Sequence, residues 1–370
     1  MKRVICLTMV VMTLIFGSCQ KNKDVVKIGA ILPLTGSMAP YGLSVKRGID
    51  LAIEEINAAD GINGRNLEII YEDSQADPKL GVSAFIKLSL MDKVPLVFGS
   101  ITSVVLGIQP EADKNKVVLV NTTAISPLIN EKSEDFLFNL VMNSATEAIA
   151  MANKFQSKHP NEKIAVFHVN NPSTTYTMDI FIETLTQLGN SNIIRETFEI
   201  ETSDFRVNLD RIRRSGAKLG YLIAFSHKEF ADIFRQTREL NMDIQWHSIS
   251  TFESREIIEL AGNTANGFIY SYPKIVDETL HAKFQKEYSD RHGAVADVLT
   301  VNSYDVTHLI ATVMRQYGTS GQDIQRGLRT IDDFYGIFGK FRLSDTGKQY
   351  VVREYGWKTI ENGEFIILEY

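Results

Sequence analysis

The fold of this chain is decided by residues 27–73, which read KIGAILPLTGSMAPYGLSVKRGIDLAIEEINAADGINGRNLEIIYED. The first six residues form an apolar, β-branched run that Pro33 closes, and a loop of small and turn-forming residues follows. Apolar residues then recur at helical spacing over 45–56, which predicts a helix packed on a sheet. A second strand is expected at 67–71. The stretch therefore predicts a right-handed βαβ unit whose first loop lies at the carboxyl edge of a parallel sheet, where ligands bind.

Strands and helices alternate in the same way along the rest of the chain. A second small, polar loop at 99–103 follows an expected strand at 94–98, and a third loop at 121–127 follows a buried run at 117–120. Because the carboxyl ends of parallel strands meet at one edge of a sheet, we expect these three loops to converge. The alternation restarts beyond residue 140, with strands expected at 163–169, 193–198, 219–225, 244–249 and 267–270, and helices at 145–156, 177–188, 205–214, 228–240 and 253–261.

The C-terminal part of the chain changes character. A helix-rich segment at 277–330 has no sheet of its own, and β-like pieces follow at 339–343, 351–358 and 365–368. We expect the helical segment to pack on the first domain, so the chain crosses between domains more than once. The pattern predicts an α/β protein with two doubly wound parallel sheets.

Size and charge narrow the class of protein. A chain of 370 residues with 44% hydrophobic content is too long for one typical core, so two domains are expected. The formal net charge of −6 becomes −8 without Lys2 and Arg3, since 37 basic residues then stand against 45 acidic ones. This acidic balance argues against nucleic acid as a partner.

The N-terminus has the pattern of an export signal. Two basic residues precede an apolar run at 4–16, which is too short to span a bilayer. The run ends in Phe16-Gly17-Ser18-Cys19, which resembles the lipobox of bacterial lipoproteins, so Cys19 is the expected lipid attachment site. The alternative is an ordinary thiol after an ordinary signal peptide. We expect an exported chain, lipid-anchored at the periplasmic or outer face of a bacterial membrane, with a tether at 20–26 that is polar over 20–24.

From residue 27 onward the chain carries an ordered series of short motifs. They are Ile28-Gly29, Pro33-Leu34-Thr35-Gly36, Tyr41-Gly42, Gly61-Ile62-Asn63-Gly64, Asp77-Pro78, Ser126-Pro127, Asp204-Phe205, Tyr304-Asp305 and Asn362-Gly363. Their order and spacing resemble the leucine/isoleucine/valine-binding proteins. These form the branched-chain amino acid branch of the type I periplasmic binding proteins, which deliver ligand to ABC importers.

The resemblance implies a monomer of two lobes joined by three crossings, with a small ligand in the cleft and closure about a hinge. The crossings are expected near 139–141, 271–273 and 354–356. The N-terminal lobe would comprise 27–140 and 273–354, and the C-terminal lobe 141–272 and 355–370. An ABC permease is the implied partner, and no cofactor is implied.

The resemblance also implies a ligand site. The serine hydroxyl that holds the ligand carboxylate matches Ser103, with Thr123 and Ile125 on the second loop and Tyr41 as the aromatic of the first loop. Amides at helix starts favour an anion, which fits this placement. The tyrosine of the second lobe matches Tyr176. Two purely structural alternatives to ligand contact stay open: Ser103 as a helix cap, and Tyr176 as a packing residue.

Three positions depart from the family's pattern. Ile125 replaces a threonine that helps to hold the ammonium group, and a second-lobe tyrosine falls on Ser226 or His227. The acidic counter-ion to the ammonium falls on Ser250, with Glu253 three positions further on. Because an unpaired buried charge is costly, these departures predict a ligand other than a branched-chain amino acid held in the usual way, such as a small organic acid or amide.

Catalytic and metal-binding patterns are absent from the sequence. It lacks the Gly-x-Gly-x-x-Gly, Gly-x-Ser-x-Gly and Gly-Lys-Ser/Thr motifs, and its seven histidines have no close metal-ligand spacing. An enzyme is therefore not expected. The sequence predicts a solute-binding lipoprotein that captures a small polar ligand, an amino acid or a related organic acid or amide, for an ABC importer. The alternative is a ligand-sensing receptor on the same fold that signals to a membrane partner.

Overall fold

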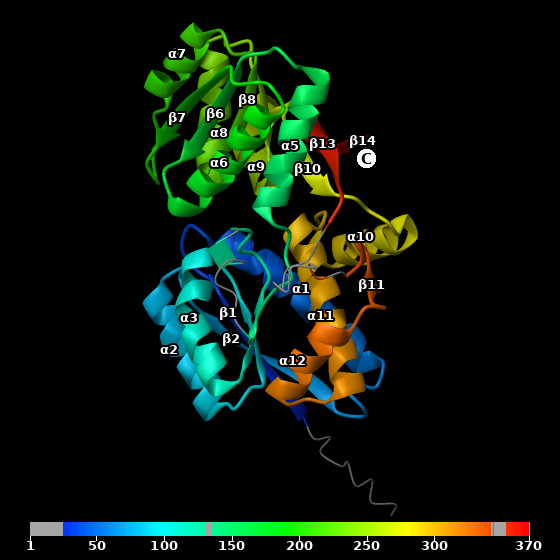
Figure 1. Ribbon diagram of the computed structural model, residues 1–370. Helices are drawn as coiled ribbons and strands as arrows, with labels where there is room; N and C mark the ends of the chain where they lie inside the picture. The colour runs from blue at the N-terminus through cyan, green and yellow to red at the C-terminus, as the bar shows by residue number, and fades with distance from the viewer. Residues whose placement is uncertain (1–24, 127, 130–134, 342, 344–352, 370) are drawn as a thin grey trace, which may run out of the picture.

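The computed structural model describes residues 25–126, 128–129, 135–341, 343 and 353–369. Two α/β lobes lie one above the other (Figure 1). The first lobe contains a five-stranded sheet in the order β2-β1-β3-β4-β5, and every pairing in it is parallel. Its strands are β1 (Val25–Leu32), β2 (Asn66–Asp73), β3 (Leu96–Gly99), β4 (Val118–Asn121) and β5 (Leu137–Asn139).

Helices cover both faces of this sheet. One face carries α2 (Pro78–Ile86), which continues as a π-helix (Lys87–Met91), and α3 (Thr102–Asn115); the other carries α1 (Ala39–Ala58), α11 (Val298–Tyr317) and α12 (Gly321–Thr330) (Figure 1). Helix α10 (Glu278–His292) packs against α11 beside the lobe junction, where the Phe284 ring lies 4.6 Å from the Tyr304 ring. The backbones of α1 and α11 approach closely, since a Cβ at Gly48 would lie 2.2 Å from the carbonyl oxygen of Thr300. The late helical segment thus packs on the first lobe, together with the short hairpin β11 (Tyr335–Gly336) and β12 (Gly339–Lys340).

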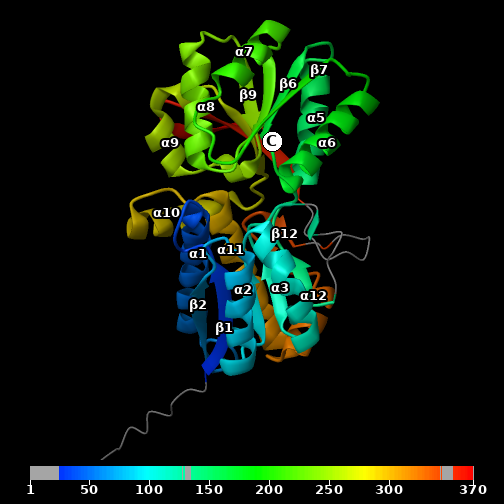
Figure 2. The same cartoon turned by 90° about the vertical axis from the view of Figure 1, so that its left-hand side faces the viewer.

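The second lobe contains a seven-stranded sheet in the order β14-β13-β10-β9-β8-β6-β7. Five of its strands are parallel, whereas β13 pairs antiparallel with both β10 and β14. Its strands are β6 (Ile164–Val169), β7 (Ile193–Phe198), β8 (Leu219–Ile223), β9 (Gln245–Ser248), β10 (Ile269–Pro273), β13 (Tyr355–Glu361) and β14 (Glu364–Glu369). Helices α5 (Ser144–Lys158) and α6 (Pro172–Gln187) cover one face; α7 (Arg206–Ser215), α8 (His227–Glu239) and α9 (Arg255–Ala261) cover the other (Figure 2).

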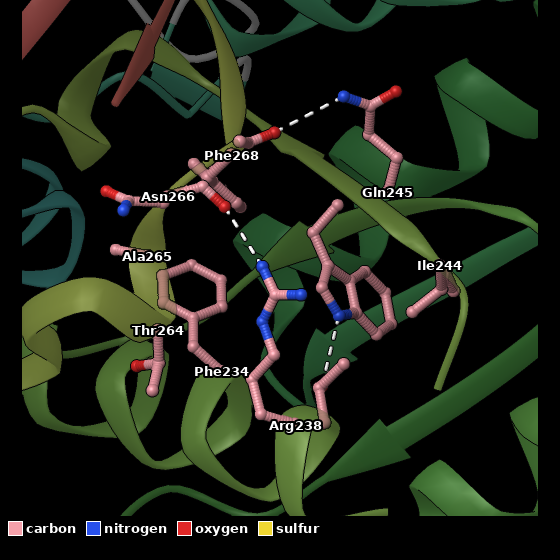
Figure 3. A pocket seen from close by; sticks show the side chains of 11 residues that line it. Phe234, Arg238, Ile244, Gln245, Thr264, Ala265, Asn266 and Phe268 are labelled. Atoms are coloured by element: carbon pink, nitrogen blue, oxygen red, sulfur yellow. Dashed lines mark hydrogen bonds between the residues drawn. The ribbon is translucent and has the colours of Figure 1, made fainter. Parts of the chain in front are cut away.

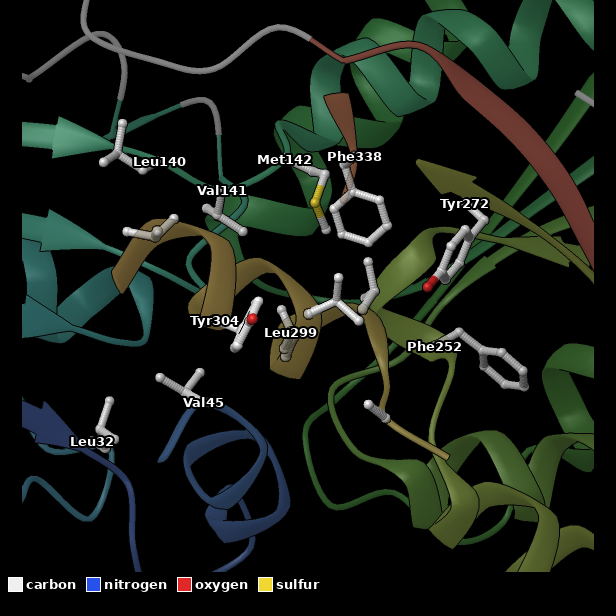
Figure 4. Close-up of a cluster of buried hydrophobic side chains, with 14 of the residues drawn as sticks. Leu32, Val45, Leu140, Val141, Met142, Phe252, Tyr272, Leu299, Tyr304 and Phe338 are labelled. Carbon is white, nitrogen blue, oxygen red and sulfur yellow. The ribbon is translucent and has the colours of Figure 1, made fainter. Parts of the chain in front are cut away.

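The predicted α/β fold with two doubly wound lobes is confirmed, with an antiparallel hairpin added to the second sheet. The chain changes lobe between β5 and α5, between β10 and α10, and between β12 and β13. Around these crossings one apolar core runs from the first lobe into the second, with Met142, Phe338 and Tyr272 at the junction (Figure 4). Within the described residues, no helix has the length and apolar character that crossing a membrane requires.

One helix begins earlier than the sequence pattern predicts, and this matters for the site. The apolar spacing predicted a start at 177, but α6 begins at Pro172. Asn171 caps the helix, because its side chain accepts a hydrogen bond from the backbone N–H of Thr174 at 3.0 Å, and Pro172 fits the first helical position. The segment before 177 is therefore the first turn and a half of a helix, and Tyr176 lies on that helix.

Candidate ligand-binding cleft

Two adjoining cavities lie between the lobes. The larger has a volume of about 470 Å³ and the smaller about 130 Å³. Both are bounded by residues of each lobe, and six residues line both: Ile101, Thr123, Ile125, Ser173, Thr174 and Phe225. The cavities therefore form two parts of one interlobe cleft at the carboxyl edge of both sheets.

The N-terminus of α3 forms the first-lobe wall. Ile101 precedes the helix without any side-chain capping bond, so the amides of Thr102 and Ser103 in the first turn have no acceptor within the helix. Ser103 is exposed in the larger cavity and is the second helical residue, which is not the capping position. The helix start thus presents amides and one hydroxyl where the macrodipole favours an anion.

The backbone at Ile101 is held in an unfavourable conformation. Its φ of 66° lies in the left-handed region, which is unusual for a β-branched residue. Thr123 holds it there: its Oγ1 accepts a hydrogen bond from the Ile101 N–H at 3.2 Å and shares a second with Ser100 Oγ at 2.6 Å. Such conformations cost about 1–3 kcal/mol and cluster at binding sites. The predicted loop residues Ser103, Thr123 and Ile125 are brought together here.

The second-lobe wall consists of the start of α6 and the end of β8. Ser173 and Thr174 face both cavities, and Thr174 Oγ1 donates to the carbonyl oxygen of Val169 at 2.5 Å. Thr177 and Ser144 share a hydroxyl hydrogen bond of 2.7 Å beside the smaller cavity. Apolar groups complete this wall: Ile200, Ile223, Phe225 and Ile249.

The two cavities carry no charged side chain among the described residues that line them, whereas a narrow pocket of about 10 Å³ that adjoins the smaller one at Tyr41 is lined by Glu253 and Asp297. The residues that line the two cavities are apolar or bear hydroxyl or amide groups, and Tyr41 is their one titratable side chain. Burial raises the pKa of the Tyr41 hydroxyl, so this group stays neutral. The lining of the two cavities can therefore hold an anion by amides and hydroxyls, and the nearby carboxylates of Glu253 and Asp297 lie in the adjoining narrow pocket.

The comparisons with known proteins decide the family. A family model described as periplasmic binding protein matches residues 25–356. The chain belongs to the periplasmic binding protein family. It is 24% identical over 350 residues to Leu/Ile/Val-binding protein homolog 2 of Brucella abortus (strain 2308), with 92% of each chain covered.

Two solved structures extend this comparison. The branched-chain amino acid transporter substrate binding protein LivJ from Streptococcus pneumoniae, in complex with isoleucine, matches with a TM-score of 0.82 and 22% identity, covering 94% of this chain and 100% of that chain. A solute binding protein of an ABC transporter from Rhodopseudomonas palustris BisB5, in complex with 3,4-dihydroxybenzoic acid, matches with a TM-score of 0.84 and 20% identity, covering 94% and 97%. This periplasmic binding protein is thus of the branched-chain amino acid ABC transporter type, in a family of solute-binding proteins.

Ser250, the position of the expected counter-ion, is turned away from both cavities of this periplasmic binding protein. Its backbone N–H and its hydroxyl both donate to the carboxylate of Glu147, at 2.8 and 2.7 Å. Ser271 donates to the same carboxylate at 2.6 Å, and burial raises the pKa of Glu147. The group of three therefore joins the loop after β9 to the last strand before the second crossing.

Glu253, the acid that follows Ser250, is also engaged. Lys358 Nζ donates to both of its carboxylate oxygens at 3.1 and 2.9 Å, and the Tyr270 hydroxyl donates at 2.5 Å. Both charged side chains are nearly fully buried, at 2% and 9% exposure. Glu253 is therefore half of a buried ion pair within the second lobe.

The remaining predicted residues have varied positions. Tyr176 is half-buried on α6 and lines neither cavity. Ser226 caps α8 in a capping box with Glu229, so its hydroxyl belongs to the helix start.

Tyr41 lines the smaller cavity, and its ring lies 4.9 Å from the ring of His227, a contact between the lobes. His227 Nδ1 is 2.8 Å from the Glu256 carboxylate, and this hydrogen bond lowers the pKa of Glu256.

Sequence reasoning missed most of the second-lobe wall, namely Ser173, Thr174, Ile200 and Phe225. The Asn-Pro pair at 171–172 is a helix-start signal and could have identified the first two.

A further hollow of about 200 Å³ lies in the second lobe at the opposite, amino edge of the sheet (Figure 3). There the Arg238 guanidinium donates to the carbonyl oxygen of Asn266 and the Trp246 indole donates to Thr237 Oγ1, so these polar groups serve the packing of α8.

Proposed function

We propose that this chain is an exported, lipid-anchored solute-binding protein that captures a small ligand with an anionic or amide end and an apolar body, and delivers it to an ABC importer. The observation that carries the proposal is the absence of any charged side chain among the described residues that line the two larger cavities of the interlobe cleft. Capture involves no chemical change of the ligand. The lobes 27–140 with 273–354 and 141–272 with 355–370 close on it as two bodies about the three crossings.

The uncharged lining disfavours an α-amino acid. An ammonium group buried in a closed cleft needs a nearby anion, because an unpaired buried charge costs more than the surrounding contacts can offset. Glu147, Glu253 and Asp297 are acids near the site, and each carboxylate already has close hydrogen-bond donors within the chain. Ile125 adds a further apolar group where an acceptor would be needed.

An anionic end fits the start of α3. The free first-turn amides, the Ser103 hydroxyl and the Thr123 hydroxyl converge there, and amide donors at a helix start bind carboxylates well. The ligand's body would then contact Ile101, Leu106, Ile200 and Phe225, which come from both lobes. Closure on an apolar body would bury these groups together with it.

The structural relatives support this ligand class as one that the fold accommodates. The Rhodopseudomonas palustris protein was solved with 3,4-dihydroxybenzoic acid, whereas the Streptococcus pneumoniae protein was solved with isoleucine. The two proteins match this chain with similar TM-scores, so the fold does not distinguish their ligand classes. The residues that line the cleft do. An aromatic or aliphatic monocarboxylate matches the uncharged, largely apolar cleft of this chain.

Calorimetry and thermal shift on one ligand panel test the proposal. The panel pairs leucine, isoleucine and valine with their deaminated acids and their amides, and adds benzoate and its hydroxylated derivatives. Monocarboxylates should bind stoichiometrically and, at a free concentration about a hundredfold above Kd, stabilise the protein by about 2.7 kcal/mol. Tight binding of leucine, isoleucine or valine that disappears when the ammonium group is removed would overturn the proposed ligand class. Recovery of chemically altered ligand would count against simple capture.

The lipid anchor at Cys19 has its own test. Mass spectrometry of the mature protein should find Cys19 as the N-terminal residue, carrying diacylglycerol, and Cys19→Ala should no longer fractionate with membranes. A mature chain that begins elsewhere would contradict the anchor without touching the ligand proposal.

A further inference from the structure

The base of the first lobe carries a shallow basic hollow. It has a volume of about 250 Å³, and its lining includes Lys27, Arg65, Asp92 and Lys93. Arg65 and Lys93 precede strands β2 and β3, and Lys27 lies near the start of β1. Because these strands are parallel and end at the cleft, the hollow lies at the edge of the sheet that faces away from the ligand site.

Two large apolar side chains project beside this hollow. The π-helix that follows α2 ends with Leu90 and Met91, which are 58% and 76% exposed, and Asp92 and Lys93 come directly after them. We call Lys27, Leu90, Met91 and Lys93 the basal surface. Exposed apolar residues flanked by basic ones are typical of surfaces that contact the headgroup region of a membrane.

The charge of the basal surface differs from that of the whole chain. The chain is acidic, with a net charge of −6, whereas Asp92 is the one acid among the described residues that line the hollow, against three basic residues. Among the described residues, neither Lys27 nor Lys93 has a carboxylate within ion-pair distance. Their charges are therefore available to an anionic partner.

The length of the tether limits what this partner can be. Five residues separate Cys19 from Val25, the first residue of β1, and the six steps of an extended chain between them span about 20 Å at most. Val25 lines the basal hollow. If Cys19 carries lipid, Val25 is held within about 20 Å of the bilayer, and with it the hollow that Lys27 and Lys93 also line.

We propose that the basal surface rests on the anionic leaflet that holds the lipid of Cys19. Leu90 and Met91 enter the headgroup region, while Lys27 and Lys93 lie beside lipid phosphates. The interlobe cleft then faces away from the bilayer and stays open to solute. The proposal rests on the lipid anchor of the proposed function but is independent of the ligand's identity.

A fluorescent reporter at Met91 tests this orientation. The lipidated full-length protein, its lipid verified by mass spectrometry, is reconstituted into phosphatidylglycerol-containing vesicles with brominated acyl chains. Met91→Trp should show a blue shift and strong quenching by the brominated lipid. Val207→Trp is the matched control, because Val207 is 65% exposed on α7 of the second lobe. The parent protein corrects for its own two tryptophans, Trp246 and Trp357.

Charge removal supplies the second measurement. Each lysine near an anionic surface contributes roughly a fivefold factor to membrane affinity, so Lys27→Gln with Lys93→Gln should reduce the membrane-seated population roughly 25-fold and abolish most of the quenching. Vesicles of phosphatidylcholine alone, which carry no net charge, should likewise reduce the quenching of Met91→Trp. Equal quenching of Met91→Trp and Val207→Trp, or none of either, would overturn the proposal.

Other outcomes separate this inference from the proposed function. A shift of the Met91→Trp emission that grows with protein concentration in lipid-free detergent would assign the surface to a second copy of the chain and contradict the membrane. A mature chain without lipid removes the premise and also overturns the proposal. Ligand titrations on the same vesicles report the cleft separately, so loss of ligand binding with quenching intact would fault only the proposed function.

Discussion

Replacement of Lys358 by methionine removes one partner of the ion pair beside the cleft. Glu253 would keep one hydrogen bond, from Tyr270, and its carboxylate is 98% buried, since the side chain is 2% exposed. Removing one partner of a buried pair leaves an uncompensated charge and costs about 3–5 kcal/mol. Loss of the contact between Lys358 Nζ and the Tyr272 ring, at 3.4 Å from the centroid, acts in the same direction. We expect the free energy of unfolding of Lys358→Met to fall by about 3–5 kcal/mol.

Urea denaturation followed by circular dichroism, at pH 7 and without ligand, measures this loss. Lys218→Met is the matched control, because the Lys218–Asp243 pair is 55% and 89% exposed and should change stability by at most about 1 kcal/mol. The double variant Glu253→Gln with Lys358→Met should recover most of the loss, since no unpaired charge then remains. A Lys358→Met cost no larger than that of the control would refute the reasoning. Glu253 would then be free enough to serve as a counter-ion to a ligand.

Three further outcomes follow from the described contacts. Ser103→Ala should weaken ligand binding by about 1–3 kcal/mol in calorimetry, and unchanged affinity with an unchanged fold would remove Ser103 from the site. Burial lowers the pKa of His247 to about 3, whereas the same histidine in the unfolded chain takes up a proton below about pH 6.5. The parent protein should therefore lose about 2 kcal/mol of stability between pH 8 and pH 5. His247→Gln should lack this loss in pH-dependent denaturation. Gly220→Ala should cost about 1–3 kcal/mol, because its Cβ would lie 2.1 Å from the Trp246 ring; an unchanged melting temperature would show that the ring moves freely.

Local patterns were enough to predict most of the elements. The helix-rich segment expected at 277–330 contains α10, α11 and α12, and the strand expected at 193–198 is β7 (Ile193–Phe198). The apolar residues of α11 recur at helical spacing and Gly318 follows its last residue, so pattern and packing agree. The start of α6 was misplaced because the signal there is polar: Asn171 and Pro172 begin the helix before any apolar repeat.

The site could be predicted only where it is built locally. Ser103 lies in the first turn of α3 and Thr123 on a loop, and both segments closely follow buried strands, so the position of each strand end gives the position of the residue. The orientation of Ser250 could not be predicted in this way, because its hydroxyl donates to Glu147, which lies 103 residues earlier in the chain. Such a contact depends on tertiary packing and leaves no periodic trace in the sequence.

The two buried acids near the cleft are both held by contacts within the second lobe. Glu147 ties Ser250 to Ser271, and Glu253 ties the same loop to Lys358 on β13. Each carboxylate is satisfied by the chain itself, and both links hold the loop after β9 against strands that lead to the crossings. Turning either acid toward a ligand would break hydrogen bonds to a buried charge, at a cost that a single ammonium contact cannot offset. Using these acids to fix the loop therefore leaves the two larger cavities without a charged lining side chain, and their polar groups are the amides and hydroxyls of both lobes.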